Sequence, residues 1–417
     1  MKARTSWPVV ALLAGFILIN FWDRAAVGFA GGAIMRDLGL SHAQFGLLGG
    51  AFFVLFPVSA LLVGPLVDRW SPKRLVAATA VVWTVAQIAM SLARTLPLAV
   101  ASRIVLGVGE GPAFPSALHS VFSAAPAARR PTVTALISLG APLGIATGAL
   151  VVTWATAAFG WRATFAMLGA VSLVWAIVWL RAPTTPAIEN TSPGRPFRSI
   201  PFNSTALGVI VAAFGVYWIL ALGVTWFPSS LEALGKLTPV RVGQILGLSW
   251  ALQALAFPLA ARGCEALQRR GFTSERSLAM PACLALAVSG ISLFGLAYSG
   301  GAVVSGVLIT LCLGCVAISV TCLPPIVAEV TDAGERGTAL SMFAAFSSTA
   351  GIVAPILFGR VVDLAPLREA GYRAAFSVSG VFLLALACAA LLLMKPSRDR
   401  VADLTDDAGD LSAAVPS

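Results

Sequence analysis

The chain has 417 residues, of which 58% are hydrophobic and only 11% are charged. An ordinary soluble domain carries roughly 25% charged residues, so this composition excludes a water-soluble fold and favours a polytopic membrane protein. The net charge of +10 does not indicate a nucleic-acid partner, because the sequence offers no soluble basic domain to bind one. Basic loops on the cytoplasmic side of a membrane explain it better.

A membrane helix takes about 20 apolar residues, which leaves room for about a dozen such helices in this chain. The apolar runs predict twelve spans, and no soluble catalytic domain fits between them. In chain order the spans are residues 8–34, 44–66, 75–93, 98–122, 133–157, 164–180, 206–227, 242–261, 277–298, 303–327, 339–361 and 374–394. The first run continues past Asp23 and Arg24 without a convincing cleavage site, so we expect an uncleaved first span.

Proline content and charge predict the domain organisation. A proline-rich break divides the spans into two groups of six. We expect an N-terminal six-helix bundle at residues 1–181, a cytoplasmic linker at 182–204, a C-terminal six-helix bundle at 205–394 and a disordered cytoplasmic tail at 395–417. Of the basic residues, 18 fall on the side of the termini and 8 on the other side. This excess predicts that both termini are cytoplasmic in the cell (inner) membrane.

An internal repeat supports two similar halves. The sequence GWRATF at Gly160–Phe165, before the sixth span, recurs as GYRAAF at Gly371–Phe376, before the twelfth. We therefore expect an all-α membrane fold of twelve helices in two pseudo-symmetric six-helix halves. Such halves bind a substrate between them near the middle of the bilayer and expose it alternately to each side.

Four ionisable residues lie inside the predicted spans: Asp23 and Arg24 in the first, and Arg103 and Glu110 in the fourth. Each costs about 2.5–3.5 kcal/mol at the middle of a membrane helix, so we expect them to be paired and retained for function. Arg103 and Glu110 are seven residues apart on one helical face, with Gly107 between them. That spacing favours a shared cavity over a direct bond. The alternative is two ion pairs that merely lock the first and fourth helices together.

Three short segments of the chain resemble a known family. The sequences FWDR at Phe21–Arg24, RIVLGVGEGPAFP at Arg103–Pro115 and TWFP at Thr225–Pro228 are similar to the anion:cation symporters of the major facilitator superfamily. With the repeat, the resemblance covers nearly the whole chain. It implies a proton-coupled importer of a small organic anion, with Asp23 and Glu110 as the proton-coupling carboxylates. It also implies that Arg24 and Arg103 contact the anion or hold these carboxylates, and it implies no enzymatic activity and no cofactor.

The loop between the second and third spans, Gly64–Arg74, resembles the loop motif of the same superfamily, with Ser71 in place of the usual glycine. The resemblance implies charge contacts that bias which side of the carrier is open. The implied gating residues are Asp68, Arg69, Arg74, Arg129 and Arg130. The alternative is a basic loop that only sets the topology.

The residues around the cavity predict the kind of substrate. The spans carry few amides, and we expect Asn20, Tyr217 and Trp218 to bind the substrate, while Trp226 and Trp250 add to the aromatic side chains of the seventh and eighth spans. An apolar cavity wall on the C-terminal side follows. This favours an aromatic or otherwise poorly hydroxylated carboxylate.

Other functions stay open. A Spinster-like lysolipid or sphingosine carrier also resembles this chain in the charges of the first and fourth spans, and an exporter of the same superfamily is a further alternative. A membrane enzyme or a channel is disfavoured, since the two histidines lie far apart in the sequence and twofold halves predict rocking rather than a symmetric pore. We expect a monomer whose partners are the small anion, protons and the lipid bilayer.

Overall fold

The computed structural model describes residues 7–69, 71–122, 130–182, 203–331 and 336–399. Within these ranges the regular secondary structure is entirely helical. The N-terminal half consists of α1 (Trp7–Phe29), α2 (Gly31–Leu38), α3 (His42–Arg69), α4 (Pro72–Ser91), α5 (Leu96–Glu110), α6 (Ala113–Phe122), α7 (Arg130–Ser138) and α8 (Gly140–Arg181).

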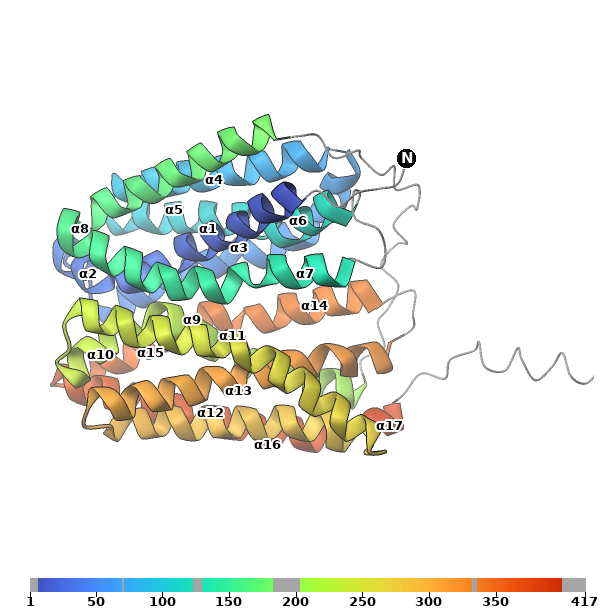
Figure 1. Ribbon diagram of the computed structural model, residues 1–417. Coiled ribbons are helices and arrows are strands. Elements are labelled where there is room, and N and C mark those ends of the chain that lie inside the picture. The colour runs from blue at the N-terminus through green and yellow to red at the C-terminus, as the bar shows by residue number, and fades with distance from the viewer. Residues whose placement is uncertain (1–6, 70, 123–129, 183–202, 332–335, 400–417) are drawn as a thin grey trace, which may run out of the picture.

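The C-terminal half follows the same plan. It consists of α9 (Ser204–Thr225), α10 (Phe227–Gly235), α11 (Pro239–Arg269), the π-helix η2 (Glu275–Ala279), α12 (Met280–Tyr298), α13 (Ala302–Glu329), α14 (Arg336–Ser348), α15 (Ala350–Leu364), α16 (Arg368–Leu393) and α17 (Pro396–Asp399). Figure 1 shows the two halves as neighbouring helical bundles, with the start of α1 and the short helix α17 at the same end. We refer to this end as the terminus side and to the other end as the far side.

Ten helical stretches in the described chain are long and apolar enough to cross a membrane. One of them, Leu136–Arg181, has 46 residues and would be about 69 Å long if straight, more than twice the hydrocarbon thickness. It contains two spans, because Gly160 has a φ of 81° inside α8, a conformation that ends one helical direction and begins another. The remaining predicted span is divided into α5 and α6 at Gly111 and Pro112. Each of the twelve predicted spans thus has a helical counterpart, and the predicted fold class is confirmed.

The repeated glycine has a different role in each half. Gly160 provides the reversal inside α8. Its counterpart Gly371 is an ordinary helical residue of α16, and a Cβ built on it would lie 2.5 Å from the backbone oxygen of Val362 in α15. The same sequence motif therefore makes a turn in the first half and a close helix contact in the second.

The beginning of the predicted tail is helical. In α17, Asp399 accepts hydrogen bonds from the backbone nitrogen and the hydroxyl of Thr205 at 3.1 and 2.8 Å, and from the hydroxyl of Ser204 at 3.1 Å. The hydrogen bond from Arg398 holds the pKa of the Asp399 carboxyl well below its usual range. At residues 396–399 the structure thus differs from the predicted disorder, because the aspartate binds the free donors at the start of α9. The rest of the tail and residues 183–202 of the predicted linker lie outside the described residues.

The two halves are pressed together on the far side. A Cβ on Gly28 of α1 would lie 1.7 Å from the backbone oxygen of Val224 in α9, and one on Gly46 of α3 would lie 2.2 Å from that of Pro355 in α15. Near the latter contact the carboxylate of Asp363 accepts hydrogen bonds from the backbone nitrogen and the ring Nδ1 of His42 at 3.0 and 2.7 Å. The bundle is therefore closed between its halves on the far side.

The close contact between Gly28 and α9 predicts the effect of adding one methyl group at this position. We expect Gly28→Ala to separate α1 from α9 and shift the protein away from this conformation, since overpacking a close contact costs about 1–3 kcal/mol. The distance between spin labels at the exposed positions Arg36 and Lys236, measured by double electron–electron resonance, should increase. The matched control is Gly15→Ala on the same helix, where an added Cβ would make only an ordinary contact, 3.8 Å from Nε1 of Trp175. Equal distances in the two variants and the unsubstituted protein would contradict the assignment of Gly28 to the closure.

Candidate functional site

The four predicted membrane charges lie on two helices that meet inside the N-terminal half. Helix α1 carries Asp23 and Arg24, and α5 carries Arg103 and Glu110. Three of them are nearly inaccessible, with exposed fractions of 0% for Asp23 and 2% each for Arg103 and Glu110. Charges so deep in an apolar bundle require partners, because burial removes them from the bulk water that would otherwise solvate them.

Arg24 and Glu110 form a two-donor ion pair. Nε and Nη2 of Arg24 donate to Oε2 of Glu110 at 2.9 and 2.8 Å. The side chain of Glu110 is completely buried, whereas that of Arg24 keeps 17% of its surface exposed. Within the described chain, Nη1 of Arg24 makes no hydrogen bond. The pair therefore joins α1 to α5 and still leaves part of the guanidinium available to another group.

Arg103 binds backbone rather than a carboxylate. Its Nη1 and Nη2 donate to the carbonyl oxygens of Asp23 and Arg24 at 3.2 and 3.3 Å. The described residues contain no direct bond between Arg103 and Glu110, which agrees with the predicted spacing argument. The alternative predicted two ion pairs between α1 and α5, and the described residues form one, between Arg24 and Glu110. The contact of Arg103 with the two carbonyl oxygens fixes the segment of α1 that carries Asp23 and Arg24.

Gly107 has a structural role between these residues. A Cβ built on it would lie 2.0 Å from the backbone oxygen of Phe52. The space that the sequence left open for a ligand or a second backbone is therefore taken by the backbone of α3. This close packing also places the aromatic side chains of α3 beside the two arginines.

Aromatic side chains surround the Arg24 guanidinium. Its Cζ lies 4.5, 4.9 and 5.1 Å from the ring centres of Phe21, Phe52 and Phe56. Rings at these distances stabilise a cation through their negative faces. Sequence reasoning missed Phe52 and Phe56, although their four-residue spacing places them on one face of the second span.

Asp23 is enclosed separately from the ion pair. Its Oδ2 accepts a hydrogen bond from the hydroxyl of Ser172 in the second part of α8 at 3.3 Å, and the side chain of Gln87 from α4 lies beside it. In the described part of the chain the Asp23 carboxylate forms no ion pair, and its Oδ1 has no hydrogen-bond partner. The two predicted proton-coupling acids therefore have different surroundings.

Several polar atoms at the site have unused bonding capacity. Asn20 lies beside the Glu110 carboxylate, yet its Nδ2 and the Oε1 of Glu110 are buried without a well-formed hydrogen bond to described residues. Buried polar groups are normally hydrogen-bonded, so an unsatisfied group indicates a place where a water molecule or a ligand can bind. Here they form a small set of donors and acceptors around one ion pair.

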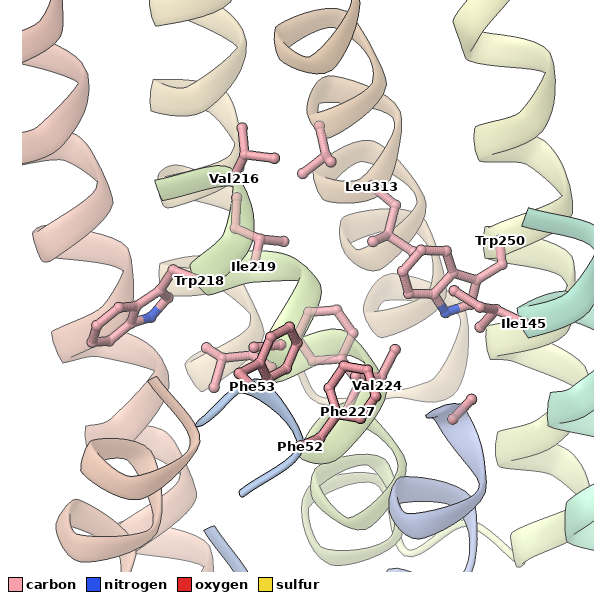
Figure 2. Close-up of a cluster of buried hydrophobic side chains, with 14 of the residues drawn as sticks. Phe52, Phe53, Ile145, Val216, Trp218, Ile219, Val224, Phe227, Trp250 and Leu313 are labelled. Atoms are coloured by element: carbon pink, nitrogen blue, oxygen red, sulfur yellow. The ribbon is translucent and has the colours of Figure 1, made fainter. Parts of the chain in front are cut away.

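The aromatic residues predicted to bind the substrate lie in different surroundings. Tyr217 of α9 lies within electrostatic range of Arg24, at the boundary between the halves. Trp218 packs instead against Phe382 of α16, with 4.7 Å between the ring centres. Figure 2 shows Trp218 and Trp250 on opposite sides of α9, with Trp250 near Leu313. Tyr217 thus lies near the charged site, and Trp218 and Trp250 belong to the packing of the C-terminal half.

Of the five predicted gating residues, the structure describes the side chain of Arg74. The side chains of Asp68, Arg69, Arg129 and Arg130 lie outside the described residues. Arg74 is exposed near the start of α4, where its backbone nitrogen donates to the hydroxyl of Ser71 at 3.4 Å. Ser71, which replaces the glycine of the loop motif, therefore serves as the N-cap of α4.

A membrane bundle of two similar six-helix halves, with the arginine of a buried ion pair close to Tyr217 of the opposite half, is typical of a secondary transporter. The chain belongs to the Major Facilitator Superfamily, since the model of that family matches residues 13–355. The predicted family is thereby confirmed. The protein is a multi-pass membrane transporter and not an enzyme.

Relatives of similar length are transporters of organic anions. The chain is 28% identical to a hexuronate transporter of Bacillus subtilis strain 168, over 95% of this chain and 96% of the relative. It is 25% identical to a probable sulfoacetate transporter of Cupriavidus necator, over 100% of this chain and 99% of the relative. Among solved structures, a bacterial homologue of the human lysosomal transporter Spinster in an inward-facing, occupied conformation matches with a TM-score of 0.82 at 16% identity, over 95% of this chain and 98% of that one. At this identity the structural match shows the fold alone.

Proposed function

We propose that the protein is a proton-coupled symporter that imports a small organic anion by alternating access. One observation carries the proposal: a completely buried glutamate is bound to an arginine that stays 17% exposed beside Tyr217 of the opposite half. An arginine held in this way can exchange its internal carboxylate for the carboxylate or sulfonate of a substrate.

Proton coupling follows from the charge balance of this pair. While Glu110 is ionised, it occupies two nitrogens of Arg24. When Glu110 takes up a proton, the ion pair is lost and the guanidinium becomes free for the anion. Asn20 and Tyr217 supply further polar groups beside it. Asp23 is proposed as the second protonatable group, and Arg103 as the residue that holds the α1 backbone in place.

The kind of anion follows from the relatives. The names of the two full-length relatives specify a hexuronate and sulfoacetate, and we propose a small carboxylate or sulfonate for this chain. The aromatic substrate that the sequence favours has no support, because the side chains of Trp218 and Trp250 pack within the C-terminal half. A Spinster-like lipid substrate is supported only by a likeness of fold.

The placement of the protein is part of the same proposal. The excess of basic residues on the terminus side supports cytoplasmic termini in the cell (inner) membrane. The described conformation, closed on the far side, would then receive or release its substrate on the cytoplasmic side. We propose that the monomer is the functional unit, because each chain contains both halves.

Transport into proteoliposomes tests this function. With an acidic exterior one pH unit below the interior, we expect a labelled hexuronate or sulfonated acid to accumulate up to about tenfold per coupled proton, since one unit is worth 1.36 kcal/mol. Hexuronates and sulfoacetate should compete better than benzoate and lysolipids. Transport of a lysolipid, or anion uptake that ignores the pH gradient, would overturn the proposal.

A further inference from the structure

A long groove runs along the outer surface of the C-terminal half, away from the charged site. Helices α11 and α13 lie beside each other there (Figure 1). Two adjoining hollows of about 680 and 790 Å³ lie between them and share Leu252, Thr310 and Leu311 in their walls. The groove is open to the surroundings, since Leu248 and Leu259 of α11, which line it, are 62% and 65% exposed. In a membrane protein this surface faces hydrocarbon.

The lining of the groove is apolar in the middle and basic at its ends. Arg241 lines the hollow on the far side, and Arg270 lines the hollow on the terminus side. The two arginines are 29 positions apart in the sequence, which corresponds to about 43 Å along a helix, close to the thickness of a bilayer with its headgroups. The two arginines therefore lie at the level of the lipid headgroups, while the groove between them lies at the level of the acyl chains.

The hollow on the terminus side has a shape that admits a chain. Gly263 of α11 and Gly314 of α13 line it, and a Cβ built on either residue meets nothing within 4 Å. The protein itself thus does not fill the space over these glycines. A flexible acyl chain can enter this space without displacing a side chain of either helix.

The charge around this end selects the headgroup. Arg262 and Arg270 are exposed and form no ion pair with described residues, whereas Arg269 pairs with Glu265 at 3.3 Å. Arg276 adds another exposed cation. Guanidinium groups bind phosphate through two parallel hydrogen bonds, and basic clusters at a membrane surface attract anionic lipids.

We propose that the hollow between α11 and α13 on the terminus side binds an anionic phospholipid of the surrounding bilayer. One acyl chain lies over Gly263 and Gly314, and the phosphate contacts Arg270. The site is separate from the substrate site and does not depend on the proposed function. Helix α11 also packs against α8 across the two halves, where a Cβ on Gly247 would lie 2.9 Å from the backbone oxygen of Ala146. A lipid bound to α11 therefore contacts one of the helices that must move during transport.

Native mass spectrometry of the purified chain tests the site. Phosphatidylglycerol and phosphatidylcholine with identical acyl chains are titrated in detergent, and the bound lipid is counted. We expect phosphatidylglycerol to be retained preferentially, and both Arg270→Gln and Gly314→Phe to weaken its retention roughly tenfold. Gly314→Leu serves as a second groove-filling variant if the phenylalanine variant does not fold by size-exclusion and thermal unfolding measurements.

Two matched controls separate the site from general effects. Arg181→Gln removes an exposed cation at the same membrane level from α8, and Val381→Phe enlarges a 56% exposed side chain on α16. Both should retain phosphatidylglycerol as the unsubstituted protein does. Equal retention of the two lipids, equal loss in the controls, or no loss in folded groove-filling variants would overturn the proposal. A dimer that disappears when Gly314 is replaced would instead assign the groove to a second copy of the chain.

Discussion

Replacing Glu110 by glutamine is expected to abolish proton-driven accumulation and to preserve exchange of substrate at equal pH. A neutral amide resembles a permanently protonated carboxylate, so Arg24 should be free for the anion in every state of the cycle. With no proton to bind or release at position 110, the opening and closing of the Arg24 ion pair is no longer linked to the pH gradient, so the gradient should not drive uptake. At a gradient of one unit, the accumulation ratio should fall from about tenfold to about one.

Proteoliposomes with and without a pH gradient measure this effect. The gradient arm reports accumulation, and the equal-pH arm reports exchange between labelled and unlabelled substrate. Glu265→Gln is the matched control, since it removes a carboxylate of the same length from a side chain that is 63% exposed. Continued accumulation in the Glu110 variant would remove this residue from the coupling role. Loss of exchange as well would indicate that its charge is needed for binding or folding.

Replacing Arg24 by alanine is expected to abolish transport and to destabilise the protein. The variant leaves Glu110 buried without its cation. Removing one partner of a buried ion pair lowers the free energy of unfolding by about 3–5 kcal/mol. Arg24→Lys should recover part of the stability but not full transport, because an ammonium cannot reproduce the bonds from Nε and Nη2 to one carboxylate oxygen. Thermal unfolding and equilibrium substrate binding measure the two effects.

A double variant distinguishes substrate binding from a structural lock. Arg24→Ala combined with Glu110→Gln removes both charges, so we expect stability close to that of the unsubstituted protein. If Arg24 contacts the substrate anion, binding stays absent in this folded double variant. If the pair only joins α1 to α5, binding returns with stability, and the assignment of Arg24 to the substrate site is wrong.

The sequence alone determined the membrane class, the twelve spans and the identity of the buried charges. These are local or additive properties: a span requires about 20 apolar residues in succession, and a charge inside it costs free energy wherever the helix lies. The family resemblance on Phe21–Arg24 and Arg103–Pro115 was confirmed as well. Boundaries differed where Gly160 joins two spans in one helix and where Pro112 follows the end of α5.

Only the tertiary structure decided how the charges are paired. Arg24 bonds to Glu110, 86 residues away in the chain, while Arg103 bonds to two carbonyl oxygens of α1. The charges and spacing allowed other arrangements, because the rotation of one helix against another depends on close contacts such as that of Gly107 with the backbone of α3. The same contacts place Phe52 and Phe56 beside Arg24 and leave Trp218 packed against Phe382. Partners across helices are set by packing, which no local pattern in this sequence encodes.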